Sequence, residues 1–122
     1  MKVLIVDDSK AMRMIVKRTL RQAGFTDVEV EEASNGKEAI SMIQSASPDL
    51  VLSDWNMPEM NGIELVTQLR TQHDSSALGV VMVTTEGGEA MVQTAMDRGA
   101  NGYVTKPFTA DAIKDALEAH LG

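Results

Sequence analysis

The sequence predicts one α/β domain built on a doubly wound, five-stranded parallel sheet. Five short apolar runs alternate with five segments of helical periodicity, and short loops join them. The run Leu50–Leu52 meets no polar residue on either face until Ser53 and Asp54, as is typical of a central strand covered by helices on both sides. A chain of 122 residues has room for one such core. We therefore expect residues 1–122 to form one domain.

Each predicted strand is a short run rich in apolar residues. The strands are expected at 3–6, 28–33, 50–54, 80–83 and 103–105. The second of them alternates between Val and Glu, so one of its faces is wetter than the other. This alternation favours a place at the edge of the sheet, which the strand order 2-1-3-4-5 provides.

The helices are predicted from caps and from apolar spacing. Ser9 and Thr109 are expected as N-caps, Asn35-Gly36 is expected to open the second helix, and Asn61 with Glu64 resembles a capping box. The helix after Gly87-Gly88 is expected to end at Gly99. The apolar residues at helical spacing are Met12, Ile15, Val16, Thr19, Leu20 and Ala23 in the first helix, Ala39, Ile40 and Ile43 in the second, Ile63, Val66 and Leu69 in the third, and Ile113, Ala116, Leu117 and Leu121 in the last.

Composition excludes several classes of function. The formal charge of −7 disfavours binding to nucleic acid, whose affinity comes largely from Lys and Arg at phosphates. No cysteine is present for disulfides or thiolate metal sites. The four-residue apolar run near the N-terminus is too short for a signal peptide or a membrane span. We expect a soluble cytoplasmic protein with no nucleic-acid or membrane partner.

Polar groups follow four of the predicted strands. The first strand leads to Asp7 and Asp8, the third to Asp54, the fourth to Thr84 and the fifth to Lys106. The carboxyl ends of parallel strands share one edge of the sheet, so these groups should converge. Carboxylates about 5 Å apart repel by about 3 kcal/mol per pair at an effective dielectric near 20. A lysine and a hard, oxygen-seeking cation would relieve this repulsion, and Mg²⁺ fits better than zinc here.

A carboxylate beside a metal, an ammonium and a hydroxyl is suited to phosphoryl transfer, with Asp54 as the nucleophile. Each group also has a structural interpretation when taken alone. Asp54 can be a turn residue, and Asp7-Asp8 can be acids placed favourably before a helix. Thr84 can be an ordinary strand end, and Lys106 can belong to an ordinary turn. Their joint arrival at one edge favours the functional interpretation.

The same residues carry a resemblance to a known family. Val6-Asp7-Asp8, Asp54 with Met57-Pro58 and Asn61-Gly62, Thr84, and Lys106-Pro107-Phe108 together resemble the receiver domain of two-component response regulators. The segments 54–58 and 101–104 are most similar to its stand-alone chemotaxis type. The resemblance covers essentially the whole chain and implies a flavodoxin-like (βα)5 fold. Its strand order, 2-1-3-4-5, is a known one that we adopt rather than derive.

The resemblance implies a role for each residue that matches the family motif. Asp54 would accept a phosphoryl group from a phosphohistidine of a sensor kinase. Mg²⁺ would be held by Asp7, Asp8, Asp54 and the backbone carbonyl of Asn56. Lys106 would contact the phosphoryl oxygens, and the peptide bond between it and the next residue, a proline, is expected to be cis.

The resemblance also implies a switch. Thr84 would turn toward the phosphoryl oxygens and Tyr103 would swing inward, which would change the partner affinity of the fourth helix, fifth strand and fifth helix. A buried core aromatic is an equal alternative for Tyr103. Asn56 and Glu86 would flank the water that hydrolyses the acyl phosphate; solvated loop residues are the alternative for both.

The partners implied are a sensor histidine kinase and a phosphorylation-dependent protein target, either the flagellar switch or another chemosensory output. A phosphatase is a further candidate, and a monomer is expected. Proteins of the flagellar class usually carry lysines at the start of the fourth helix and on the fifth; here Gly88, Glu89 and Ala116 stand there instead. Because paired charges set partner choice, this departure argues against the flagellar motor as the target.

Two other functions stay open from the sequence. One is a phosphorelay intermediate that passes the phosphoryl group from Asp54 to a histidine phosphotransfer protein. The Thr84 and Tyr103 pair favours a switch over a relay. The other is a phosphohydrolase with an aspartyl nucleophile, a class that usually has an acid two residues later. Asn56 occupies that position and cannot donate a proton as an acid would.

Overall fold

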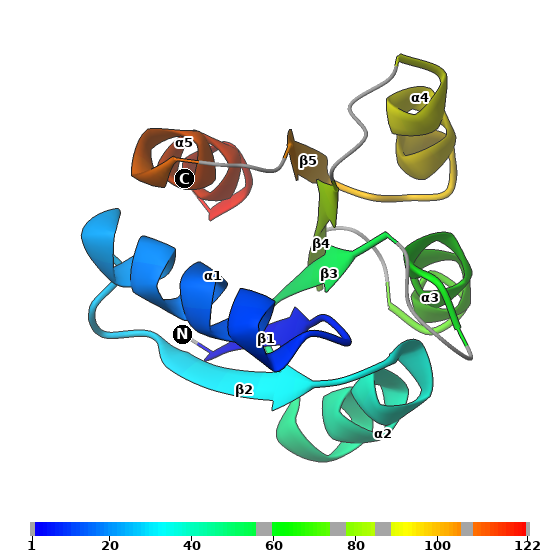
Figure 1. Ribbon diagram of the computed structural model, residues 1–122. Helices are drawn as coiled ribbons and strands as arrows, with labels where there is room; N and C mark the ends of the chain where they lie inside the picture. Colours follow the sequence, from blue (N-terminus) through cyan, green and yellow to red (C-terminus); the bar gives the residue numbers. More distant parts are fainter. Residues whose placement is uncertain (1, 56–59, 74–77, 85–88, 106–108, 122) are drawn as a thin grey trace.

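Helices cover both faces of a five-stranded parallel sheet in the computed structural model (Figure 1). The structure describes residues 2–55, 60–73, 78–84, 89–105 and 109–121. The elements are β1 (Lys2–Val6), α1 (Lys10–Gln22), β2 (Glu29–Ala33), α2 (Gly36–Ala46), β3 (Leu50–Asp54), α3 (Gly62–Leu69), β4 (Gly79–Thr84), α4 (Glu89–Asp97), β5 (Gly102–Thr105) and α5 (Ala110–Leu121). Each lies within a residue or two of its predicted place.

The strand order is β2-β1-β3-β4-β5, with all neighbours parallel, which confirms the predicted α/β class and order. The central strand β3 is buried from Leu50 to Ser53, whereas β2 is partly exposed along most of its length. The more exposed strand, β2, therefore lies at the edge of the sheet, where only one of its two sides has a hydrogen-bonded neighbour.

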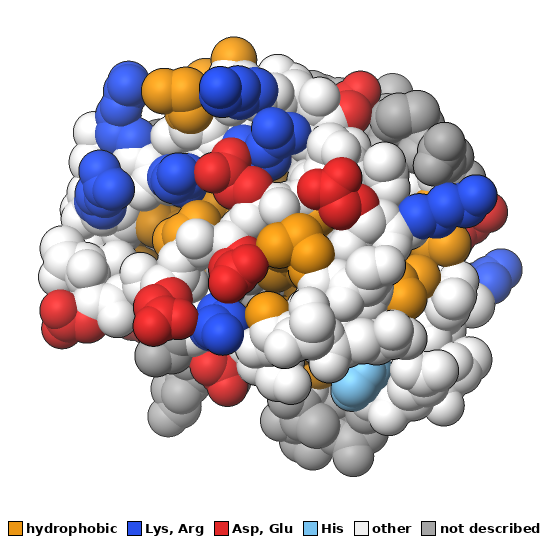
Figure 2. Space-filling view, turned by 90° about the horizontal axis from the view of Figure 1, so that it is seen from below, with side chains coloured by type: hydrophobic (Ala, Val, Ile, Leu, Met, Phe, Trp, Pro, Cys, Tyr) orange, Lys and Arg blue, Asp and Glu red, His pale blue; other side chains and the backbone are white. Residues whose placement is uncertain are grey.

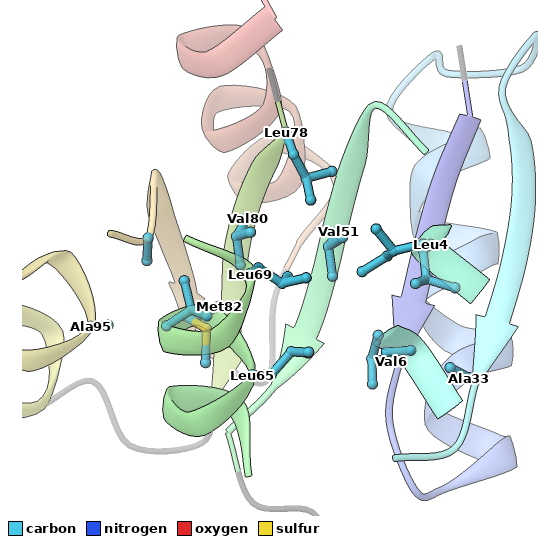
Figure 3. Close-up of a cluster of buried hydrophobic side chains, with 14 residues drawn as sticks. Leu4, Val6, Ala33, Val51, Leu65, Leu69, Leu78, Val80, Met82 and Ala95 are labelled. Carbon is cyan, nitrogen blue, oxygen red and sulfur yellow. The ribbon is translucent and has the colours of Figure 1, made fainter. Parts of the chain in front are cut away.

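Successive strand residues point to opposite faces and build two cores. Leu4, Val51 and Val80 are in register across β1, β3 and β4 and lie on the face covered by α2, α3 and α4. Figure 3 shows Leu65 and Leu69 of α3 beside this face. The other face belongs to a second core, whose helix residues are Val16, Leu20, Ile113 and Leu117 of α1 and α5. Each fully buried aliphatic side chain contributes about 1.5–3 kcal/mol.

The predicted N-caps are confirmed. The side chains of Ser9 and Asn35 accept hydrogen bonds from the backbone N–H of the third residue of α1 and of α2, respectively. Asn61 and Glu64 form a reciprocal capping box at α3, with N···O distances of 2.9 and 3.2 Å. The Thr109 hydroxyl accepts from the backbone N–H of residue 112 at the start of α5.

The predicted apolar spacing of the helices includes residues that are not fully buried. Ile15 is 44% exposed, because the buried stripe of α1 runs through Val16, Thr19 and Leu20 and leaves Ile15 on the outer side. In α3 the buried stripe is Gly62, Leu65, Val66 and Leu69. Ile63 is thereby only partly buried, and Leu65 takes the inward place.

Candidate functional site

Three carboxylates meet at the carboxyl edge of the sheet. Asp54 is the last residue of β3, and Asp7 follows the last residue of the neighbouring strand β1. Asp8 comes next along the chain. Each residue offers one carboxylate oxygen, and these oxygens lie within 4.8 Å of one another. Asp7 is buried, Asp54 partly buried and Asp8 exposed, so the cluster opens to solvent on one side.

Backbone and side-chain contacts fix Asp7 firmly. Its N–H donates to the carbonyl of Ala33 at 3.1 Å, which extends the β1–β2 ladder by one residue. Its carboxylate oxygen Oδ1 accepts the backbone N–H of Ser9 at 2.9 Å. Its carbonyl oxygen accepts from Arg13 Nη1 at 2.6 Å. The turn between β1 and α1 therefore holds the Asp7 carboxylate in a defined place.

The return of the chain into α3 fixes the backbone beside Asp54. The N–H of Gly62 donates to the carbonyl of Trp55 at 2.8 Å. An ideal Cβ on Gly62 would lie 2.6 Å from the Asp54 carbonyl oxygen, closer than side-chain carbons come in real structures. A glycine is therefore required where α3 packs against the end of β3. Ser53 is fully buried, and its hydroxyl donates to the Asp54 carbonyl at 3.0 Å.

The electrostatics of this cluster favour a cation. At about 5 Å and an effective dielectric near 20, two carboxylates repel by about 3 kcal/mol, and solvent around Asp8 reduces that value. The donor set consists of carboxylate oxygens, and neither histidine nor cysteine belongs to it. Hard divalent cations such as Mg²⁺ prefer oxygen ligands, so the residues present fit this ion.

The structure describes the other predicted site residues only in part. The backbone of Thr84 ends β4, opposite Thr105 of β5, and the preceding residue, Val83, is opposite Asp54. Thr84 thus lies on the strand next to the cluster, at the same edge. Asn56, Glu86 and Lys106 lie outside the described residues, as do the expected cis bond after Lys106 and the glycine pair at 87–88.

Tyr103 is exposed. Its side chain in β5 is 44% accessible, so the alternative of a buried core aromatic is wrong for this conformation. Tyr103 borders a shallow groove of about 510 Å³ between β5 and α5, with Thr105, Ala112 and Asp115 among the lining residues. β5 is the edge strand of the sheet and pairs only with β4, so no further strand covers its free side. Ala116, where the sequence departs from the lysine pattern, also lines this groove.

Sequence inspection missed the residues that support the cluster from outside. Arg13 contacts the backbone of Asp7, and it is paired with Glu32 of β2. One pattern in the sequence could have indicated them. The helix after Asp7-Asp8 contains no acidic residue, and Arg13 and Lys17 are one turn apart on it, so both can bind an acid from another element. Gly62 entered the sequence analysis only as part of the family motif, because its place against the Asp54 carbonyl follows from the tertiary structure.

Glu32 has a lowered pKa. The largest cause is the hydrogen bond from Lys17 Nζ at 3.0 Å; Arg13 Nε at 3.0 Å and both positive charges act in the same direction, and burial opposes them. A carboxyl whose folded-state pKa is depressed stabilises the fold above the unfolded-state pKa of 4.5. That contribution is lost as the pH falls through the folded-state value.

Glu32→Gln should therefore lower the free energy of unfolding at neutral pH, by about 1 kcal/mol because the pair is partly solvated. The difference from wild type should shrink as the pH falls below 4.5 and through the lowered folded-state pKa of Glu32. Urea denaturation at several pH values measures it. Glu31→Gln is the matched control, since Glu31 lies one residue earlier in β2 and forms no ion pair with any residue that the structure describes. A difference that is independent of pH would contradict the ion-pair explanation.

A parallel doubly wound sheet with a carboxylate cluster at its carboxyl edge defines a class of α/β domain with an acidic site at the strand ends. The model of one such family, the response regulator receiver domain, matches residues 3–118. The chain belongs to this family. The described residues contain no helix long and apolar enough to span a membrane.

Relatives that match this chain along nearly all of its length include several chemotaxis proteins. The chain is 46% identical to chemotaxis protein CheY1 of Helicobacter pylori, over 100% of this chain and 98% of that protein. It is 44% identical to chemotaxis protein CheY of Pseudomonas aeruginosa, over 97% and 94%. The solved structure of chemotaxis protein CheY4 of Vibrio cholerae matches with a TM-score of 0.85 and 39% identity, over 98% and 97% of the two chains.

Proposed function

We propose that this protein is a single-domain response regulator in which Asp54 accepts a phosphoryl group in the presence of Mg²⁺. The observation that carries the proposal is the convergence of Asp7, Asp8 and Asp54, with carboxylate oxygens within 4.8 Å, at the carboxyl edge of a receiver-type sheet. Asp54 is at the tip of the buried central strand and is partly accessible, as a nucleophile must be.

In the proposed reaction a carboxylate oxygen of Asp54 attacks the phosphorus of a phosphohistidine on a sensor kinase. A P–O bond to Asp54 forms as the P–N bond breaks, and the released imidazole nitrogen takes up a proton. Asp7, Asp8 and Asp54, with the Asn56 carbonyl, are the proposed ligands of Mg²⁺, which when bound supplies positive charge for the phosphoryl oxygens. Lys106 is proposed to contact the same oxygens.

Thr84 and Tyr103 are proposed to report the phosphorylation to the surface of α4, β5 and α5. The phosphoryl group must bind the active arrangement more tightly than the inactive one, or the equilibrium does not shift. The exposed position of Tyr103 leaves room for an inward rotation. Asn56 and Glu86 are proposed to tune hydrolysis of the acyl phosphate.

The relatives named above support a role for this protein in a chemotaxis pathway in the cytoplasm, with a sensor histidine kinase as the phosphodonor. The output partner would be the flagellar switch or another chemosensory target, and a phosphatase would be a further partner. We propose that the chain acts as a monomer of one receiver domain. The phosphorelay alternative is not favoured, because the full-length relatives are chemotaxis proteins.

Mg²⁺ should stabilise the protein, because a ligand that binds the folded state alone raises its stability by mass action. At ten times the dissociation constant the gain is about 1.4 kcal/mol, which corresponds to a rise in Tm of about 5 °C for a domain of this size. Thermal unfolding followed by circular dichroism, with and without about 10 mM MgCl₂, measures the shift.

Two controls accompany this experiment. NaCl at the same ionic strength should give a smaller shift, because it screens the cluster without occupying it. Asp8→Asn, a change at the exposed member of the cluster, should reduce the response to Mg²⁺. If wild type unfolds at the same temperature with and without Mg²⁺, the proposed metal site is wrong.

A further inference from the structure

One guanidinium group links the acidic cluster to the edge of the sheet. Arg13 of α1 donates from Nη1 to the carbonyl oxygen of Asp7 at 2.6 Å and from Nε to Glu32 Oε1 of β2 at 3.0 Å. Its side chain is 15% exposed, so both contacts are shielded from most of the solvent. Hydrogen bonds with an ionised donor are about twice as strong as neutral ones.

Glu32 is itself held from a second side. Its other carboxylate oxygen accepts from Lys17 Nζ at 3.0 Å, one turn further along α1. Arg13 and Lys17 therefore both donate to the carboxylate of Glu32. Because this carboxylate is held by Lys17, its bond to Arg13 restricts the rotation of the Arg13 side chain. On the face drawn in Figure 2, Lys and Arg side chains gather at the upper left, with Asp and Glu side chains beside them.

Arg13 holds a part of Asp7 that differs from those bound by Ala33 and Ser9. The Asp7 N–H is used by Ala33 and the carboxylate Oδ1 by the N–H of Ser9. With the carbonyl oxygen bound to Arg13, the peptide plane between Asp7 and Asp8 is held as well. The orientation of this plane sets the direction in which the chain presents both carboxylates.

We propose that Arg13 is a positioning residue for the Mg²⁺ site: braced by Glu32, it orients the backbone that carries Asp7 and Asp8. This inference rests on the proposed function. Two effects of Arg13 have opposite signs. Its positive charge near the cluster opposes cation binding, whereas its hydrogen bond orders the ligands and favours binding. In the proposal the ordering effect is the larger, as for the outer partners of other metal ligands.

The test is Mg²⁺ titration of Arg13→Ala by calorimetry, with the fluorescence of Trp55 as a second readout because this tryptophan is adjacent to Asp54. The dissociation constant should rise about tenfold. Lys17→Met is the matched control: it removes a positive partner of Glu32 but no contact with Asp7, and it should change the constant by less than about twofold. Phosphorylation of Arg13→Ala by acetyl phosphate should approach the wild-type rate when Mg²⁺ is saturating.

Arg13→Lys keeps the charge but cannot form both bonds of the planar fork, so it should also bind Mg²⁺ more weakly than wild type. This variant decides the matter if Arg13→Ala does not fold. An unchanged or tighter dissociation constant in a folded Arg13 variant would overturn the inference. The same holds if Lys17→Met weakens binding as much as Arg13→Ala does. Absence of Mg²⁺ binding to the wild type would instead overturn the proposed function.

Discussion

Asp54→Asn should abolish phosphorylation of the protein by acetyl phosphate and Mg²⁺. The amide is a poor nucleophile, and it also removes one of the three carboxylates of the cluster. Intact-protein mass spectrometry should show the mass of one added phosphoryl group on wild type and none on the variant. Asp49→Asn is the matched control, because Asp49 precedes the amino end of the same strand and its exposed side chain lies far from the cluster. It should be phosphorylated at the wild-type rate.

Asp54→Asn should also fold and be more stable than wild type without Mg²⁺, by about 1 kcal/mol or more, since it removes repulsion from two neighbouring carboxylates. Its Tm should respond less to Mg²⁺ than that of wild type. Phosphorylation that persists at another residue of a folded Asp54→Asn protein would remove Asp54 from its proposed role.

Local signals were sufficient to predict the order of the elements and the convergence of the acids. The uninterrupted apolar run before Asp54 identified the central strand, and the glutamates of β2 identified an edge. Once parallel strands are inferred, their carboxyl ends must share an edge, so Asp7 and Asp54 could be placed together without coordinates. The strand order itself came from known folds.

Contacts that join distant segments could not be predicted in this way. Periodicity predicts the apolar side of a helix, but the way the helix packs on the sheet decides which residues of that side are buried. Ile15 belongs to the apolar spacing and is nevertheless exposed for that reason. The exposure of Tyr103 depends on how α5 packs beside β5. The contact of Arg13 with a backbone carbonyl leaves no pattern in side-chain chemistry, because the acceptor is common to all residues.

Gly62→Ala should impair both stability and phosphorylation. The new Cβ would approach the Asp54 carbonyl oxygen to 2.6 Å and would overlap Met82 Cε, with Trp55 Cα at 3.1 Å. The methionine end can rotate away, but the backbone carbonyl can move only with the strand tip. We expect a loss of about 1–3 kcal/mol in the free energy of unfolding, as for other overpacked sites. Displacement of Asp54 should slow phosphorylation about tenfold or more.

Gly102→Ala is the control for this prediction. Among the residues that the structure describes, and apart from the two chain neighbours of Gly102 in β5, no heavy atom lies within 4 Å of a Cβ at this position. The same substitution there should leave stability within about 0.5 kcal/mol of wild type. Urea denaturation measures stability, and the time course of phosphorylation is followed at a temperature where every variant is folded. A Gly62→Ala protein that loses stability but is phosphorylated at the wild-type rate would show that the packing of α3 against the end of β3 does not position the nucleophile. The support of Asp54 would then have to come from within β3 and its neighbouring strands.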